Sequence, residues 1–179
     1  MKKTTLLILF FTAFSILAQD KFQTNTATVN FQASVPLFEE VKAVNKSGTI
    51  VLEPSTSTLV CTVIVKDFRF KMDLMEEHFN ANYVESHRYP KAVFKGKIEK
   101  FDLKNINTTE QSYDVKGKLY LHGKSKVITV TALIKRVDNG IQITSTFPIS
   151  VSDFNIEIPY MVANKISKTV QTDLSGIMR

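Results

Sequence analysis

Residues 112–121 read Ser-Tyr-Asp-Val-Lys-Gly-Lys-Leu-Tyr-Leu, and apolar or small side chains alternate with polar ones along this stretch. The odd-numbered positions from Tyr113 to Leu121 carry the apolar and small residues, and mostly charged residues fall between them. Successive side chains of a β-strand point to opposite faces, so a period of two predicts a strand with one dry face and one wet face. The stretch therefore favours a β protein.

The same alternation recurs over most of the chain and predicts eight strands. Asp138-Asn139-Gly140 is typical of a tight hairpin, and other short polar turns separate the remaining strands. Consecutive strands joined by short turns run antiparallel, and eight of them can close into a barrel that leaves no exposed edge. We therefore expect an all-β fold with one helix, in the form of an eight-stranded antiparallel barrel. The expected strands cover residues 22–35, 48–53, 58–70, 91–102, 112–121, 126–137, 140–152 and 165–177.

Two segments break the period of two. In residues 71–86, apolar side chains recur at spacings of three and four, namely at Met72, Met75, Phe79 and Tyr83. This spacing predicts a short amphipathic helix that caps the barrel, and Pro90 follows it. The helix could be an adaptable lid over an apolar guest or a plug that closes one barrel end. Residues 153–165 are expected to form an irregular loop or a short helical turn.

The N-terminus has the pattern of a secretory signal peptide. Lys2 and Lys3 precede an apolar run over residues 6–17, and the small residue Ala18 follows the run. A membrane anchor is the competing interpretation, but a run this short does not comfortably cross about 30 Å of hydrocarbon. We therefore expect residues 1–19 to be a signal peptide and residues 20–179 to be one exported, periplasmic or secreted, barrel domain without a transmembrane anchor.

Length and charge exclude several protein classes. A chain of 179 residues with 44% hydrophobic and 22% charged residues fits one globular domain rather than a disordered segment. The formal net charge is +6, but the lysines alternate with apolar positions, as they would on a solvated sheet face. Nucleic-acid binding requires a clustered basic patch with interleaved aromatic residues, so no nucleic-acid partner is expected.

Candidate catalytic and metal-binding groups are few. The histidines are His78, His87 and His122, and the residue four positions after His78 is Asn82, so a helical zinc pair is missing. Cys61 lies among apolar strand residues and is expected to be a small buried hydrophobic residue rather than a nucleophile. The sequence also lacks a Gly-rich phosphate loop and a nucleophile elbow. The chain is therefore predicted not to be an enzyme and to hold neither a metal ion nor a cofactor.

The expected inward positions mix small and large side chains. An eight-stranded barrel is either filled by its own side chains or encloses one small ligand, and the mixture leaves both alternatives open. A hollow, uncharged interior would select an amphiphile with a long apolar tail, because an unpaired buried charge is costly. A filled interior would instead suggest an envelope protein-interaction module that binds its partner through the outer surface or residues 159–164. The predicted ligand-binding residues of the hollow form are Phe68, Met75, Phe79, Tyr83, Phe94, Leu119, Phe147 and Phe154.

Several motifs resemble those of the YceI family of lipid and polyisoprenoid-binding proteins. They are a helix carrying Phe79, the step Tyr89-Pro90 into a strand, Phe94 with Gly96 on that strand, and a later hairpin with Gly117, Leu119 and Gly123. The resemblance covers nearly the whole chain after the signal peptide. It implies an extended, lipocalin-like antiparallel barrel in the bacterial periplasm. It also implies that the interior holds a long isoprenoid lipid, such as a quinone or a polyprenyl chain.

Overall fold

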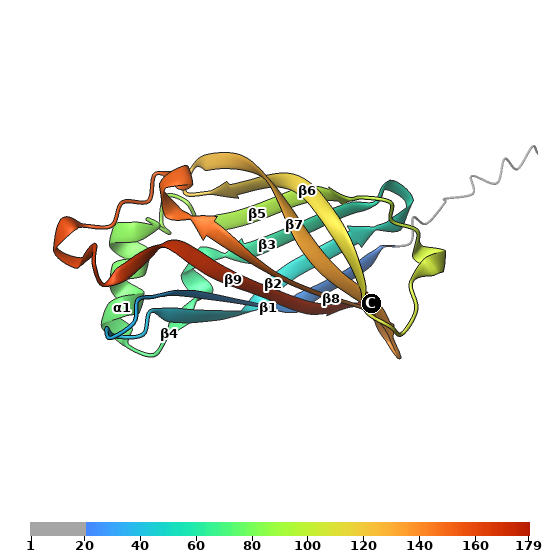
Figure 1. Cartoon of the computed structure of the whole chain (residues 1–179), viewed down its shortest axis with the longest axis horizontal. Coiled ribbons are helices and arrows are strands. Elements are labelled where there is room, and N and C mark those ends of the chain that lie inside the picture. The colour runs from blue at the N-terminus through green and yellow to red at the C-terminus, as the bar shows by residue number, and fades with distance from the viewer. Residues whose placement is uncertain (1–20) are drawn as a thin grey trace, which may run out of the picture.

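The computed structural model describes residues 21–179, which form a closed, eight-stranded antiparallel β-barrel (Figure 1). Going round the barrel, the strand order is β1-β9-β8-β7-β6-β5-β3-β2, and the pairing of β1 with β2 closes the cylinder. The predicted fold class is thereby confirmed, whereas the predicted signal peptide lies outside the described residues. The eight barrel strands are β1 (Phe22–Ser34), β2 (Lys42–Glu53), β3 (Thr58–Ile64), β5 (Lys91–Ile98), β6 (Gln111–Leu121), β7 (Lys124–Val137), β8 (Gly140–Ser150) and β9 (Ile166–Met178). The two-residue strand β4 (Arg69–Phe70) pairs with the beginning of β2.

Strand β2 is twice as long as predicted. A β-bulge interrupts the alternation of its side chains, so the sequence pattern revealed only its second half. Ala27 pairs with Gly48 and Val29 with Asn45, so β2 has one residue more than β1 in this interval. The extra residue shifts the inward-facing positions from odd numbers to even numbers, which hides the period of two. The expected strand 48–53 therefore begins at Lys42 in the structure.

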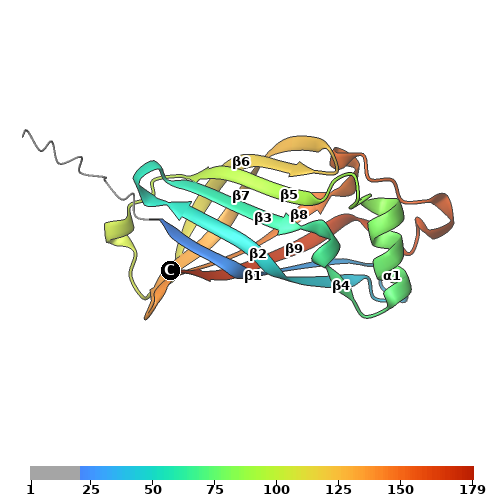
Figure 2. The same cartoon turned by 180° about the vertical axis from the view of Figure 1, so that it is seen from behind.

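The predicted helix over residues 71–86 is shorter than expected and changes its winding. It consists of α1 (Asp73–His78) followed by a π-helical turn over Phe79–Tyr83. The segment ends where Glu85 adopts a positive φ of 44°. As Figure 2 shows, it lies across one end of the barrel, which we call the helix end. The prediction that a short helix caps the barrel is correct.

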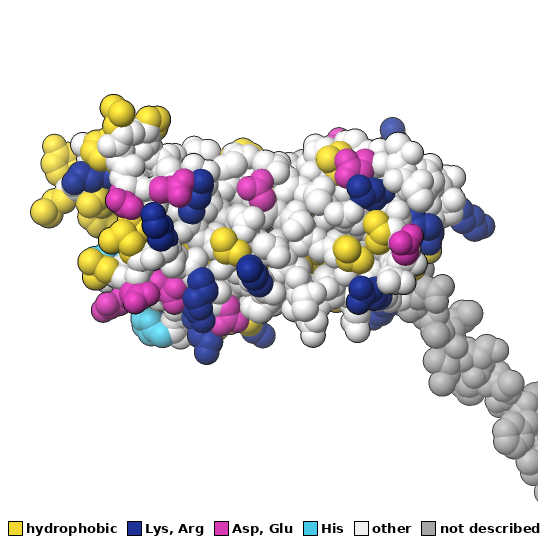
Figure 3. Space-filling model, turned by 90° about the horizontal axis from the view of Figure 1, so that it is seen from below, with side chains coloured by type: hydrophobic (Ala, Val, Ile, Leu, Met, Phe, Trp, Pro, Cys, Tyr) yellow, Lys and Arg dark blue, Asp and Glu magenta, His cyan; other side chains and the backbone are white. Residues whose placement is uncertain are grey.

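The outer surface carries charges of both signs, which are interspersed on the face shown in Figure 3. One group of like charge does occur on the outside of β5 and β6. There the strand register places Lys95 opposite Lys118, and Lys97 opposite Lys116. The sequence pattern did not predict this group, because its members become neighbours only through strand pairing.

Side chains fill the half of the barrel that lies away from α1. The largest fully buried residues there belong to one cluster, and small residues such as Ala27 and Ala132 complete it. A helical turn at Leu103–Asn105 and the buried Ile106 cover this end. The principal members of the cluster are Ile50, Leu52, Val115, Ile134, Ile141, Ile143 and Met178.

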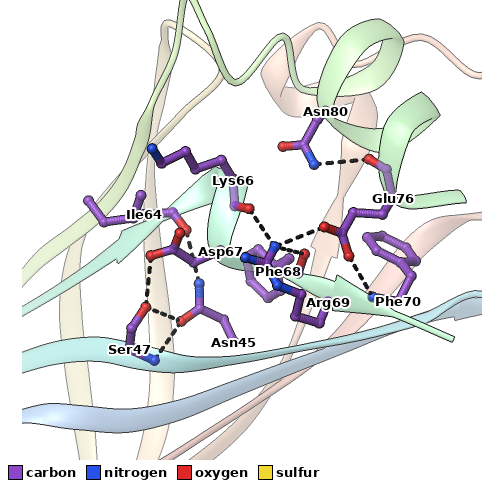
Figure 4. A network of polar contacts seen from close by, with 10 residues as sticks. All are labelled: Asn45, Ser47, Ile64, Lys66, Asp67, Phe68, Arg69, Phe70, Glu76 and Asn80. Atoms are coloured by element: carbon purple, nitrogen blue, oxygen red, sulfur yellow. Dashed lines mark hydrogen bonds and ion pairs between the residues drawn. The ribbon is translucent and has the colours of Figure 1, made fainter. Parts of the chain in front are cut away.

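The expected strand 58–70 is interrupted, because residues Val65–Asp67 form a 3₁₀ turn between β3 and β4. Long-range hydrogen bonds hold the break open (Figure 4): Asn45 Nδ2 donates to the Ile64 carbonyl at 2.9 Å, and Ser47 Oγ donates to Asp67 at 3.0 Å. Beyond the break, the Glu76 carboxylate of α1 accepts from Arg69 at 2.8 Å and from the backbone N–H of Phe70 at 3.2 Å. The turn thus brings β4 back to the helix and fixes both at the helix end.

Candidate ligand-binding site

The half of the barrel nearest α1 is hollow. It encloses a cavity of about 410 Å³ that runs from the middle of the barrel to the helix end. Cavities of this size are typical of sites that take a small organic molecule. The lumen is therefore filled by side chains at one end and hollow at the other. The two alternatives left open by the sequence, a filled barrel and a hollow one, each describe half of it. The strand residues of the wall include Val29, Val63, Ala92, Val130, Ile143, Ile149 and Leu174.

A glycine pair keeps the middle of the lumen open. Gly96 on β5 lies directly opposite Gly117 on β6, and the ring of Phe94 lies over both. A Cβ atom at Gly96 would be 2.8 Å from Cζ of Phe94, and one at Gly117 would be 2.7 Å from it. Only glycine leaves enough room, so the ring can rest against the wall instead of projecting into the cavity.

Four phenylalanines join the helical segment to the strands. The aromatic cluster consists of Phe31 of β1, Phe68 and Phe70 at β4, and Phe79 of the π-helical turn. The ring centroids of Phe31 and Phe68 are 5.2 Å apart, and those of Phe70 and Phe79 are 5.1 Å apart. Three of the five ring pairs are edge-on, an arrangement that aromatic rings prefer, and the other two are tilted. All four rings line the cavity, so the cluster both holds the cap and forms its inner surface.

A second connection between cap and barrel is polar. The ring of His122, in the turn between β6 and β7, has Nδ1 2.9 Å from the Phe154 carbonyl and Nε2 3.0 Å from the Glu85 carboxylate. Glu85 also accepts from Arg88 at 2.7 Å. Hydrogen bonds from Arg88 and then His122 lower the pKa of Glu85 below its usual value. His122 therefore has a structural contact that joins the end of the cap to the barrel rim.

Seven of the eight predicted ligand-binding residues lie on the cavity wall; these are Phe68, Met75, Phe79, Tyr83, Phe94, Leu119 and Phe147. Their contact with a ligand remains a prediction. Phe154 is the exception, because it does not line the cavity and is buried against the wall residues Val65 and Val84. Strand β8 ends at Ser150, and Phe154 lies in a 3₁₀ turn over Val151–Phe154, beyond the expected strand 140–152, where strand alternation does not indicate which side faces inward.

Several wall residues were not predicted. Phe31 follows the alternation of β1 and could have been found from it. Phe38, Ile158 and Val162 lie in irregular segments at the helix end, where no periodicity identifies the inward side. Their position depends on how the loops fold over the rim.

The wall is uncharged except at the mouth of the cavity. Among the wall residues, the acidic, basic and histidine side chains are limited to Glu39, Lys165 and His78, and all three are exposed to solvent. Deeper in the lumen, Ser145 is satisfied by donating to the Thr131 carbonyl at 2.7 Å. Burial raises the pKa of the Tyr83 phenol, which keeps its hydroxyl protonated. The cavity can therefore solvate an apolar chain, while charged partners for a polar head group lie only at the mouth.

The described residues offer no sign of metal chemistry. Within residues 21–179, no group of three or more His, Cys, Asp or Glu side chains could hold a metal ion. Burial raises the pKa of the Cys61 thiol to about 12, so it is a poor nucleophile near neutral pH. The same part of the chain contains no helix with the length and hydropathy that crossing a membrane requires.

Comparison with known proteins identifies a family. The sequence profile of the YceI-like domain matches residues 21–176. No curated protein matches the chain in sequence.

Solved structures resemble the barrel closely in shape but weakly in sequence. A polyisoprenoid-binding domain from Saccharophagus degradans, implicated in plant cell wall breakdown, is 18% identical with a TM-score of 0.75, and the alignment covers 87% of this chain and 95% of that one. Burkholderia cenocepacia BcnA is 18% identical with a TM-score of 0.67, covering 83% and 94%. The Campylobacter jejuni YceI protein is 19% identical with a TM-score of 0.60, covering 81% and 89%. At these identities the likeness establishes the fold.

Proposed function

Because the chain belongs to the YceI-like family, we propose that it binds one amphiphile with a long apolar tail, an isoprenoid or polyisoprenoid lipid. The tail lies in the barrel cavity and the head group stays at the mouth. The observation that carries this proposal is the uncharged cavity of about 410 Å³, with its only charged groups at the rim. The name of the Saccharophagus degradans domain, a polyisoprenoid-binding domain, supports the choice of lipid.

The cavity volume limits how much of a tail it can cover. At about 30 Å³ for each water-sized group, 410 Å³ holds roughly a dozen methylene groups. Each buried methylene contributes about 0.8 kcal/mol, so a dozen contribute about 10 kcal/mol before association and ordering costs. Association costs of about 4 kcal/mol or more leave at most about 6 kcal/mol, so the dissociation constant is on the order of tens of micromolar or weaker. A longer polyprenyl tail would extend past the rim at the helix end.

We further propose that the protein is exported and acts as a carrier or a sequestering protein without enzymatic activity. The basic and apolar pattern of residues 1–19 supports export to the periplasm or beyond the cell. The unreactive thiol of Cys61 and the structural contacts of His122 support a binding role rather than a catalytic one. The cavity argues against the alternative of an interaction module with a filled core.

A chain-length series tests the binding proposal. Dissociation constants of linear and isoprenoid alcohols would be measured by calorimetry. Affinity should rise by roughly fourfold for each added methylene, because 0.8 kcal/mol is worth that factor, and should stop rising near a dozen carbons. The variant Ala92→Phe, which places a ring on the cavity wall, should move this limit to shorter chains. Affinities that do not depend on chain length would contradict the proposal.

A further inference from the structure

The rim of the cavity carries large apolar side chains that are exposed to solvent. Three segments form it: the loop between β1 and β2, the first turn of α1, and the turn Tyr160–Val162. Figure 3 shows hydrophobic side chains gathered at this end of the molecule. Tyr160 is 95% exposed and Met161 86% exposed, and Leu37 is fully exposed. Side chains of this size normally avoid such exposure when several of them lie together.

Each segment supplies one side chain to the cavity wall and the neighbouring side chain to solvent. Phe38, Met75 and Val162 line the cavity, whereas Leu37, Leu74 and Met161 beside them in sequence are exposed. The apolar surface of the lumen therefore continues over the rim at these three places, beside the charged groups of the mouth. A partner on this rim would touch the opening through which a ligand enters and leaves.

The backbone of Leu37 indicates that its exposure is maintained against a cost. Its φ is 71°, in the left-handed region that branched apolar residues rarely adopt. Leu37 therefore carries two unfavourable free-energy terms: the strained backbone and the exposure of its apolar side chain to water. Strained positions of this kind are often functional.

From these observations we infer that the rim is a docking surface for a phospholipid bilayer, into which Leu37, Tyr160 and Met161 insert. This inference rests on the proposed function, since a tail held in the lumen would come from or go to a membrane. The exposed side chains lie on the tips of separate segments around an opening. A bilayer accepts such tips without matching pockets, whereas a protein partner would need one for each. A tyrosine is also well suited to the interface between lipid and water.

Charge predicts what kind of membrane would bind. Residues 35–41, 71–78 and 155–168 together contain more acidic than basic residues. Attraction to anionic lipids therefore cannot supply the binding, and insertion of the apolar tips must do so. Binding should consequently occur on neutral phosphatidylcholine vesicles and should not depend on salt.

Vesicle flotation tests the inference with the chain that lacks its predicted signal peptide. The protein should float with phosphatidylcholine vesicles, and the double variant Tyr160→Asp/Met161→Asp should partition at least tenfold more weakly. Neither residue lines the cavity, so the double variant should still bind the fluorescent apolar probe 1-N-phenylnaphthylamine in vesicle-free solution. The matched control is Ile177→Asp, because Ile177 is 43% exposed on β9 beside the C-terminus, at the opposite end of the barrel (Figure 1). This control should float like the parent protein.

Three results would overturn the docking surface: no flotation of the parent protein, equal loss in the Ile177→Asp control, or flotation only with anionic vesicles. A parent protein that dimerises through the rim, while the double variant is monomeric, would also overturn it, because a second copy would then cover the tips. Probe binding without flotation refutes the docking surface and leaves the proposed function intact. Flotation without probe binding supports the docking surface and refutes the proposed function.

Discussion

Replacing Phe79 and Phe154 by alanine separates the two roles that buried phenylalanines have in this barrel. Phe154 is 1% exposed and does not itself line the cavity; it packs against the wall residues Val65 and Val84. Phe79 is half-buried, and one side of its ring faces the cavity. Truncation of Phe154 leaves a new void, so Phe154→Ala should lower the free energy of unfolding by about 3–5 kcal/mol. Phe79→Ala only enlarges an existing space and should cost about 1–2 kcal/mol.

The effect on ligand binding should run in the opposite direction. A ring face that covers on the order of 50 Å² of an apolar tail contributes about 1.2 kcal/mol at 25 cal/mol per Å², which is roughly eightfold in the dissociation constant. Phe79→Ala should lose this factor, whereas Phe154→Ala should bind the tail as the parent protein does. Phe79→Leu, which retains much of the apolar surface, should recover most of the affinity.

Urea denaturation and calorimetric titration with a long-chain alcohol measure the two quantities on the same preparations. The contrary result is that Phe79→Ala destabilises the protein as much as Phe154→Ala does and leaves the affinity unchanged. That pattern would mean that Phe79 is an ordinary core residue and that the cavity takes no tail.

Three further predictions concern single residues. Cys61 should react only slowly with thiol reagents at pH 8 in the folded protein and quickly in denaturant, because burial raises its pKa to about 12; fast labelling of the native state would contradict this. The pKa of Glu85 is lowered in the folded state, so its contribution to stability is present above the usual value of 4.5 and is lost as the pH falls through the folded-state pKa. In urea denaturation at several pH values, the difference between Glu85→Gln and the parent protein should therefore be greatest above pH 4.5 and shrink in acid; a constant difference would count against the contact with Arg88 and His122. Gly117→Ala should lower the free energy of unfolding by about 1–3 kcal/mol, because its Cβ would lie 2.6 Å from the Lys95 carbonyl oxygen; an unchanged urea midpoint would show that the wall can move.

The sequence predicted the strands wherever side chains alternate between the inner and outer faces of the barrel without interruption. The hairpin of β7 and β8 is an example, since Asp138-Asn139-Gly140 supplied the turn and both strands alternate cleanly. Prediction from alternation failed where a bulge or a long-range hydrogen bond interrupts a strand. The bulge in β2 shifted the inward positions, and the break after Ile64 depends on Asn45, which is nineteen residues away along the chain.

The candidate site was predictable in its membership but not in its volume. Alternation identifies Phe94 and Leu119 as inward-facing, yet whether the lumen is hollow depends on where their rings and methyl groups lie. The ring of Phe94 rests in the recess over Gly96 and Gly117, which strand register alone creates. Phe154 does not line the cavity, because it lies in a 3₁₀ turn after β8, in a region where strand alternation does not indicate the inward side.

Native mass spectrometry tests most directly whether the hollow half of the barrel holds a hydrocarbon tail. The chain would be exported from a bacterial host, purified without detergent and then incubated with a polyprenyl alcohol. We expect one bound molecule per chain, either carried from the host or taken up from the added alcohol, and a weaker adduct for Phe79→Ala. A protein that carries no lipid from the host and takes up no alcohol would show that the barrel does not bind a hydrocarbon tail.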